Sequence, residues 1–412
     1  MDLDLTEANA FGARLREIRE WRQMSQETLA GLAGYKSQAS ISRLESGQAE
    51  VPNRNKLELL ADALRCAVED LIDRPWKREP DPKAHAGLVA VEHALDTYEF
   101  GTDTGVPVRD WAEVQADVNR LVLLQHQFAD YIGQGELAPK LMAELHAAYV
   151  RRPELRREVL LGLIVAYSSA AWVAKRLGNG RGWSVMATKE AKRCADELGL
   201  PQWRGYTAWL RADATGSTDR EVQYRRAVSA ADELRPALDH PETLQAYGML
   251  NLSAALAAAT KAKPDRDTAT THLAEAADVA RRLDQEVGEF AHMLFGTVNV
   301  GIWTTSINLE LGERGKVAEI ARTVNIDAIE SPSRRAEFYA DVGRALLLEK
   351  GKRDKGLELL LKAEDLAPQR VRHDPLVREA VRGHVRWVKR DAVGIRLRGL
   401  ASRMGLRLTT IG

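Results

Sequence analysis

The sequence predicts an all-α protein in which a small N-terminal domain of five helices precedes a right-handed array of helical hairpins. Aromatic residues make up only 6% of the 412 residues, and Ala, Leu, Glu and Arg, which favour helix, recur at helical spacing along most of the chain. Three prolines at positions 75–82 interrupt any helix and mark a linker. Beyond the linker, pairs of helices recur about every 35 to 40 residues, which is the period of helical repeat arrays.

These signals divide the chain into three parts. We expect the N-terminal domain at residues 8–74, a proline-rich linker at 75–84 and the helical array at 85–412. A stack of helix pairs curves into a superhelix with a concave face. The architecture therefore supplies a binding surface in addition to the N-terminal domain.

The helix pairs of the array share turns and small residues. Gly312 and Gly351 stand where the end of a helix needs a positive φ. The segment Gly351–Pro368 resembles the second half of a tetratricopeptide repeat, and alanines at packing positions let neighbouring helices approach closely. The expected pairs are 156–178 with 183–199, 242–260 with 267–283, and two that begin at Phe295 and Ser333.

Composition excludes several classes of protein. Cys66 and Cys194 are far apart, without the spacing of a disulfide framework or a zinc site, which fits a reducing cytoplasmic compartment. The acidic N-terminus lacks the features of a signal peptide. The longest uncharged run, Val159–Ala174, is shorter than the roughly 20 residues of a membrane span and predicts a buried helix. No sequence signature of a catalytic site or a cofactor site occurs, so we expect neither an enzyme nor a cofactor.

Two adjacent short helices are predicted between residues 25 and 47. Ser25 begins the first helix as an N-cap and Gly34 ends it. The second helix, Gln38–Glu45, carries Ala39, Ile41 and Leu44 to face its neighbours and polar side chains on its other side. Two short helices across a tight turn form a helix-turn-helix.

These residues closely resemble the lambda repressor and Cro family: Ser-Gln-Glu-x-Leu-Ala from Ser25, and Ile-Ser-Arg-Leu-Glu-x-Gly ending at Gly47. The turn is one residue longer than is usual in that family. The resemblance implies that the second helix reads base edges in the major groove while flanking groups hold phosphates of a double-stranded DNA operator. The expected base-reading residues are Gln38, Ser40, Ser42 and Arg43, and the expected phosphate contacts are Gln26, Lys36, Arg54, Asn55 and Lys56.

The charge of this domain leaves two functions open. Residues 11–78 contain twelve basic and ten acidic residues, far fewer excess cations than an isolated DNA-binding domain carries. A homodimer that reads two half-sites about 34 Å apart would compensate for weak binding by one domain. The alternative is an interaction scaffold whose helix-turn-helix does not bind DNA and whose array binds a protein.

The array resembles the sensor part of actinobacterial regulators that join such a helix-turn-helix to tetratricopeptide-like repeats, on the residues 295–300, 331–335, 363–368 and 372–375. More remotely, the arrangement is similar to the peptide-pheromone receptors of Gram-positive bacteria. The resemblance implies an effector in the groove, either a peptide, which we favour, or a small metabolite. Packing within the core is the alternative for each candidate ligand residue: Trp203, Tyr206, Trp209, Arg211, Tyr247, Asn251, Asn299 and Trp303.

The C-terminal region is basic, with eleven basic and three acidic residues from Arg370 onward. Arg378, Arg382, Arg386 and Arg390 recur every four residues and would form one positive stripe on a helix. This stripe could contact DNA, an acidic ligand or the acidic body of the array. Because the last needs no new partner, we expect this helix to pack on the array. The sequence thus predicts a cytoplasmic, ligand-responsive, homodimeric transcriptional regulator that has no membrane segment.

Overall fold

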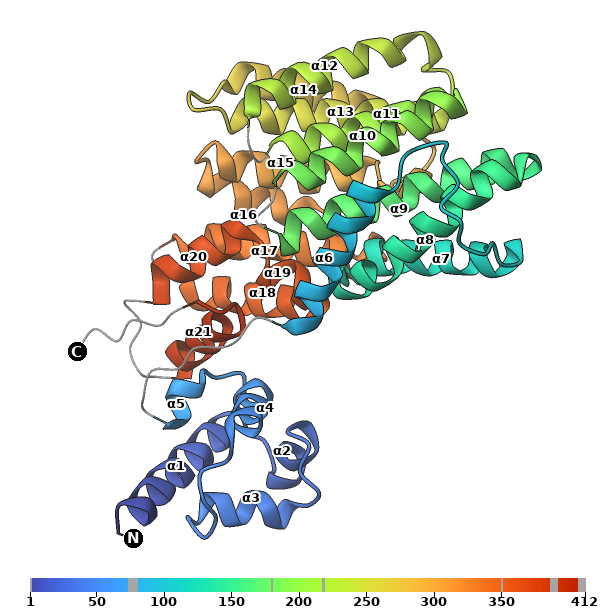
Figure 1. Ribbon diagram of the computed structural model, residues 1–412. Coiled ribbons are helices and arrows are strands. Elements are labelled where there is room, and N and C mark those ends of the chain that lie inside the picture. The colour runs from blue at the N-terminus through green and yellow to red at the C-terminus, as the bar shows by residue number, and fades with distance from the viewer. Residues whose placement is uncertain are drawn as a thin grey trace. The chain divides into compact units, whose positions relative to one another are not determined.

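The computed structural model describes residues 2–72, 81–178, 181–216, 219–349, 351–385 and 392–406 (Figure 1). These residues form helices, turns and loops without a strand, which confirms the predicted all-α class. They divide into two compact units. The first unit combines Met1–Pro80 with Arg372–Gly412, and the second unit is Asp81–Val371. Residues 75–80 of the predicted linker lie outside the described residues.

The first unit contains the five predicted N-terminal helices. Ser25 caps one of them by accepting a hydrogen bond from the backbone N–H of Thr28, and Asn53 caps another through the N–H of Lys56. Phe11, Leu15, Leu29, Ile41, Leu60 and Leu71 are buried in its core. The helices are α1 (Asp2–Trp21), α2 (Gln26–Leu32), α3 (Gln38–Glu45), α4 (Arg54–Leu64) and α5 (Val68–Ile72).

The C-terminal helices α20 (Pro375–Val385) and α21 (Ala392–Arg403) belong to this first unit. We expected the array to extend to residue 412, whereas the residues from Arg372 onward belong to the first unit. Ile395 of α21 is buried in the same core as the five N-terminal helices, and α21 contacts α4 and α5 (Figure 1). Apolar contact and an ion pair between Arg398 and Asp70 hold α21 in the first unit. Arg386 and Arg390 lie outside the described residues.

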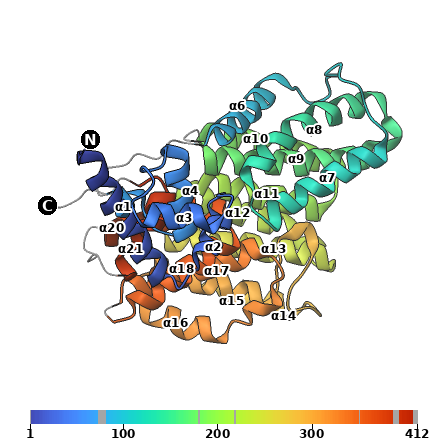
Figure 2. The same ribbon diagram turned by 90° about the horizontal axis from the view of Figure 1, so that it is seen from below.

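The second unit is a series of helical hairpins that follow one another round the unit from α6 and α7 to α15 and α16 (Figure 2). The predicted pairs are confirmed as α9 with α10 and α13 with α14, and Gly312 and Gly351 take positive φ of 78° and 84°. The helices are α6 (Pro82–Thr97), α7 (Trp111–His126), α8 (Tyr131–Arg151), α9 (Arg156–Leu177), α10 (Arg181–Leu198), α11 (Pro201–Gly216), α12 (Arg220–Leu234), α13 (Pro241–Ala259), α14 (Arg266–Arg281), α15 (Thr297–Glu310), α16 (Arg314–Thr323), α17 (Pro332–Leu347), α18 (Arg353–Leu366) and α19 (Pro368–Arg372).

Helix α9 is the buried helix that the uncharged run predicts. The segment Pro153–Leu177 is long and apolar enough to cross a membrane, but 72% of its most apolar window is buried inside the protein. Its residues pack against α8 and α10. The apolar run is therefore accounted for by contacts within the unit.

Residues near the end of the second unit contact the end of α7 and the start of α8. Ser331 donates a hydrogen bond from Oγ to the carbonyl of His126 (2.6 Å), and Gln369 donates from Nε2 to Asp130 Oδ1 (2.6 Å). These partners are 205 and 239 positions apart in the sequence. We call these contacts the array closure, because they join the beginning of the second unit to its end.

A buried histidine makes the stability of the second unit depend on pH. His146 is fully buried, and its Nε2 lies 2.7 Å from the hydroxyl of Tyr167. Burial lowers the pKa of His146 to about 4. The folded state favours the neutral ring, whereas the unfolded chain takes up a proton below pH 6.5. The free energy of unfolding is therefore unaffected by the protonation of His146 above pH 6.5 and decreases as the pH falls towards 4.

We predict that His146 alone lowers the free energy of unfolding by about 2 kcal/mol between pH 7 and pH 5. Chemical unfolding of the wild type and of His146→Gln at both pH values measures this, and the variant should show a smaller loss on acidification. His240→Gln is the control, because His240 is exposed. An equal loss in wild type and His146→Gln would contradict the prediction.

Candidate nucleic-acid interface

Helix α3 presents a polar surface that is not used for packing. Ile41 and Leu44 are buried against the rest of the first unit, whereas Gln38, Ser42 and Arg43 are exposed and Ser40 is half-buried. The prediction that Ala39 faces inward is wrong, since Ala39 is exposed. Ala39 lies more than half a turn around the helix axis from Ile41 and therefore faces the other side of α3. Three of the predicted base-reading residues, Gln38, Ser42 and Arg43, are thus on the open surface of α3, whereas Ser40 lies nearer the buried side.

A network of polar side chains fixes this helix from behind. Arg19 of α1 makes a bidentate ion pair with Glu45 at the end of α3, with N–O distances of 2.5 and 2.9 Å. The Arg19 and Glu45 side chains are 11% and 4% exposed, and the hydrogen bond to Glu45 raises the pKa of Arg19. Planar guanidinium–carboxylate pairs of this kind restrict geometry strongly. The pair therefore locks the orientation of α3 against α1.

The same network continues to the predicted DNA surface. Gln26 donates from Nε2 to Glu45 Oε2 (2.7 Å), and its Oε1 accepts a hydrogen bond from Gln38 Nε2 (3.2 Å). Gln38 is the first residue of α3. Gln26 therefore positions the first predicted base-reading side chain, a role that was not expected for it from the sequence.

The predicted phosphate contacts divide into two groups. Lys36, Arg54 and Asn55 are exposed. Lys56 instead donates from Nζ to the carbonyls of Gly34 (2.6 Å) and Ala33 (3.3 Å), and the ammonium lies 4.6 Å from the ring centre of Tyr35. A cation at the C-terminal end of a helix is favourable. Lys56 thus holds the long turn between α2 and α3.

In the second unit, three of the predicted groove residues form one aromatic group. Trp203, Tyr206 and Trp209 lie on α11, with ring centres 5.8 Å and 6.0 Å apart along the series. The Tyr206 hydroxyl bonds to Ser168 of α9 (2.9 Å). Trp209 Nε1 and Arg211 Nε are buried without a hydrogen-bond partner among the described residues.

Two other predicted groove residues are used between α13 and α14. Tyr247 donates its hydroxyl proton to Glu275 (2.7 Å), and Asn251 is hydrogen-bonded to the carbonyl of Tyr247 (3.1 Å) and to His272 (2.9 Å). Both residues are almost completely buried. Their polar groups are therefore occupied by contacts between helices.

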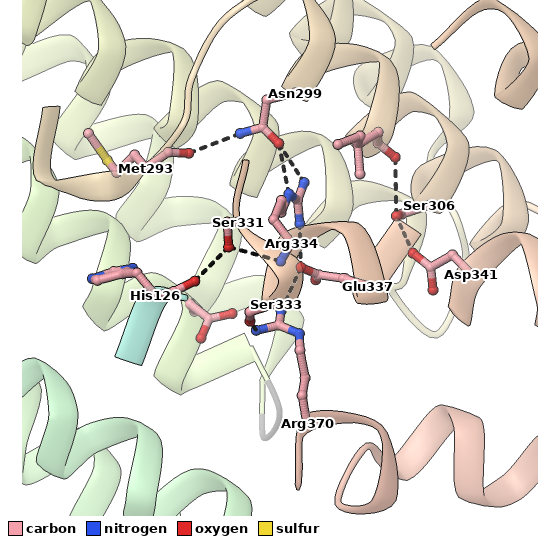
Figure 3. A network of polar contacts seen from close by, with 12 residues as sticks. His126, Met293, Asn299, Ser306, Ser331, Ser333, Arg334, Glu337, Asp341 and Arg370 are labelled. Carbon is pink, nitrogen blue, oxygen red and sulfur yellow. Dashed lines mark hydrogen bonds and ion pairs between the residues drawn. The ribbon is translucent and has the colours of Figure 1, made fainter. Parts of the chain in front are cut away.

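Asn299 belongs to a larger network, shown in Figure 3, which Trp303 adjoins. Asn299 donates to the carbonyl of Met293 (3.0 Å) and accepts two hydrogen bonds from Arg334 (2.6 and 2.9 Å). The Arg334 guanidinium also lies 5.6 Å from the ring centre of Trp303. Arg334 thus links α17 to α15.

Glu337 joins Arg334 of α17 to Arg370 of α19 (Figure 3). Arg370 lies 2.5 Å from Glu337 Oε2 and also donates to Ser333 Oγ (3.3 Å). Burial raises the pKa of Glu337, but the charges of Arg334 and Arg370 outweigh it and lower the pKa to about 2. We call Asn299, Arg334, Glu337 and Arg370 the Glu337 network.

Further pairs between α15 and α17 extend this polar surface. Ser306 donates to Asp341, and Arg344 bonds to Asp341 (2.9 Å) and Glu310 (3.0 Å). The charged residues of α17 follow one helical face at positions 334, 337, 341 and 344. This face was not predicted from the sequence, although that spacing was a signal for it.

Comparison with known proteins bears on the first unit. Residues 10–74 match a protein family described as a helix-turn-helix domain. The HTH-type transcriptional repressor RghR of Bacillus subtilis is 31% identical over 129 residues, which are 31% of this chain and 83% of RghR. The chain belongs to the helix-turn-helix family of transcriptional regulators. This regulator is thus a DNA-binding protein, as the residues of α2 and α3 predict, and its relative is a repressor rather than an enzyme.

Two solved structures share low similarity with the regulator along most of its length. One is Bacillus thuringiensis PlcR in complex with the peptide PapR7 and DNA, with 12% identity, a TM-score of 0.37, and coverage of 90% of this chain and 99% of PlcR. The other is the apo form of the competence regulator ComR from Streptococcus vestibularis, with 12% identity, a TM-score of 0.34, and coverage of 97% and 99%. Similarities this distant do not define a ligand.

We predict that Gln38→Ala and Arg43→Ala each weaken binding to the operator by about 5- to 100-fold, since each would remove a base contact. Titration of the regulator with the DNA upstream of its own gene and with a scrambled duplex measures the loss of selectivity. Arg225→Ala is the matched control, because it removes an exposed arginine of α12 in the other unit. Unchanged selectivity in both α3 variants would show that α3 does not read the bases.

Proposed function

We propose that this regulator is a cytoplasmic homodimer that binds a specific operator through α3 and binds an effector in its helical array, which controls operator binding. A peptide effector is favoured over a small metabolite. The observation that carries the proposal is the Glu337 network, because it holds three charged side chains in a sheltered position within the array. Taking charges out of water is costly unless they are closely paired.

The composition of the network suits a ligand with an anionic group. Arg334 and Arg370 share one carboxylate, so the cluster of these three side chains carries one excess positive charge. Asn299 adds an amide, which can donate and accept as a peptide backbone does. A carboxylate of the effector would compete with Glu337 for the two arginines, while its apolar part would contact Trp303 or the α11 rings.

The proposed mechanism is a shift in population between two arrangements of the array. Arg370 is adjacent to Gln369, which forms part of the array closure. An effector that rearranges Arg370 would thereby favour one arrangement of the closure and so change the spacing of the two α3 helices in the dimer. The effector must bind one arrangement more tightly than the other for this to occur.

The experiment that tests DNA recognition is binding of the purified regulator to its upstream DNA and to a scrambled duplex at several salt concentrations. Selective binding that weakens with salt is expected, since phosphate contacts release counterions. Equal, weak binding to both duplexes, together with retention of a protein partner by the array, would favour the scaffold function instead.

We predict that Glu337→Gln lowers the free energy of unfolding of the second unit by about 1 to 3 kcal/mol, because it leaves two sheltered guanidinium groups without their carboxylate. Thermal and chemical unfolding measure this loss. Glu233→Gln is the matched control, since Glu233 is exposed on α12. An effector that acts at the network should also bind the Glu337→Gln variant with altered affinity. Equal stability of the two variants would show that the network does not hold the array.

A further inference from the structure

The DNA-binding unit is built from both ends of the chain. Helix α21 contacts α4 and α5, and Ile395 of α21 is 8% exposed within the core that α1 to α5 form. No such contribution to the domain is visible in the sequence of residues 8–74. The docked position of α21 therefore requires its own explanation.

The backbone of α21 lies directly against the end of α4. A Cβ atom added at Gly399 would be 2.1 Å from the carbonyl oxygen of Arg65 and 2.7 Å from the Cα of Cys66. Both neighbours are backbone atoms, which cannot turn aside as a flexible side chain can. Only glycine allows this approach, so the contact is specific in register as well as in orientation.

An ion pair fixes the same interface. Arg398 Nε lies 2.7 Å from Asp70 Oδ1, and the two side chains are 13% and 7% exposed. The other carboxylate oxygen of Asp70 accepts the backbone N–H of Ala67 (3.0 Å) at the start of α5. Removing one partner of a pair this well buried strongly destabilises the folded protein. Asp70 thus connects the start of α5 to α21.

Helix α20 is bound to α21 at the far end. Arg378 of α20 donates to the carbonyls of Arg372 (3.0 Å) and Met404. These contacts hold the segment that enters α20 and the segment that leaves α21 together. Helices α20 and α21 therefore form one body, which we call the C-terminal helix pair.

The chain enters this helix pair directly from the array. Gln369 and Arg370 are fixed by the array closure and by the Glu337 network, and Val371, the last residue of the second unit, is 2% exposed. Pro375 already begins α20. Five positions therefore separate an arginine of the Glu337 network from a helix of the DNA-binding unit.

We propose that the α4–α5 face of the DNA-binding unit is a docking surface for the chain's own C-terminal helix pair, and that this docking makes the unit stable and competent to bind DNA. Docking leaves the polar face of α3 open, because α21 contacts α4 and α5 while Gln38, Ser42 and Arg43 remain exposed. Displacement of Arg370 would affect the docked helix pair through the short segment of chain that joins Arg370 to α20. The part of this account that involves an effector rests on the proposed function, whereas the docking itself does not.

A charge exchange in the full-length regulator tests the docking without an effector. Asp70→Arg and Arg398→Asp each place like charges in the interface, and each should raise hydrogen exchange in α4 and α5 and weaken operator binding by about 10-fold or more. The double variant restores an opposite pair, although not the hydrogen bond that Asp70 accepts from Ala67, and should bind the operator more tightly than either single variant. Arg382→Asp is the control, since it makes the same charge change at an exposed position of α20. Hydrogen exchange in α9 to α14 should remain unchanged in all variants.

Gly399→Val tests the same interface without a charge. It should raise exchange in α4 and α5 as much as Arg398→Asp does. The proposal is overturned if the single variants leave α4–α5 exchange and operator affinity unchanged, or if the double variant recovers neither. If the charge-exchange variants behave as expected but no effector changes operator binding, effector sensing is rejected and the docking is retained. If the charge-exchange variants do not behave as expected but an effector still changes operator binding, only the docking is rejected.

Discussion

The contact on which the arrangement of the second unit depends is the one that joins its end to its beginning. Hairpins stacked one on another leave the two ends of an array free, and the curvature is then set only by neighbouring pairs. Here Ser331 binds the end of α7, and Gln369 binds Asp130 at the start of α8. Glu337 sits between the arginines of α17 and α19 that adjoin these residues. The closure therefore restricts the curvature of the array and holds Gln369 and Arg370, near the end of the second unit, in place.

A second polar network holds the helices of the DNA-binding unit in place. Glu45 receives Arg19 from α1 and Gln26 from α2, so one carboxylate holds three helices in a fixed relation. The hydrogen bond from Gln38 to Gln26 then extends this order to the surface. Both units thus use a sheltered glutamate bound to arginine, a choice that favours a defined geometry over maximal stability.

The sequence was sufficient for features that depend on local spacing. Helical periodicity identified the hairpins, and polar residues of α3 without a packing partner identified Gln38, Ser42 and Arg43 as surface residues. It did not reveal contacts between distant positions. Asp70 and Arg398 are 328 positions apart, and the summed charge of the C-terminal region suggested a place on the array instead. Likewise, a sequence shows the charge of Lys56 but not the carbonyls of Gly34 and Ala33 that accept its hydrogen bonds.

The central claim is that the state of the array reaches the DNA-binding unit through the chain that follows Arg370. Hydrogen exchange of full-length Arg370→Gln tests it most directly, because Arg370 lies in the second unit and the readout lies in the first. The account predicts faster exchange in α17 and α19 and also in α4 and α5, with α1 to α3 less affected. Faster exchange confined to the array, with α4 and α5 unchanged from the wild type, would contradict it.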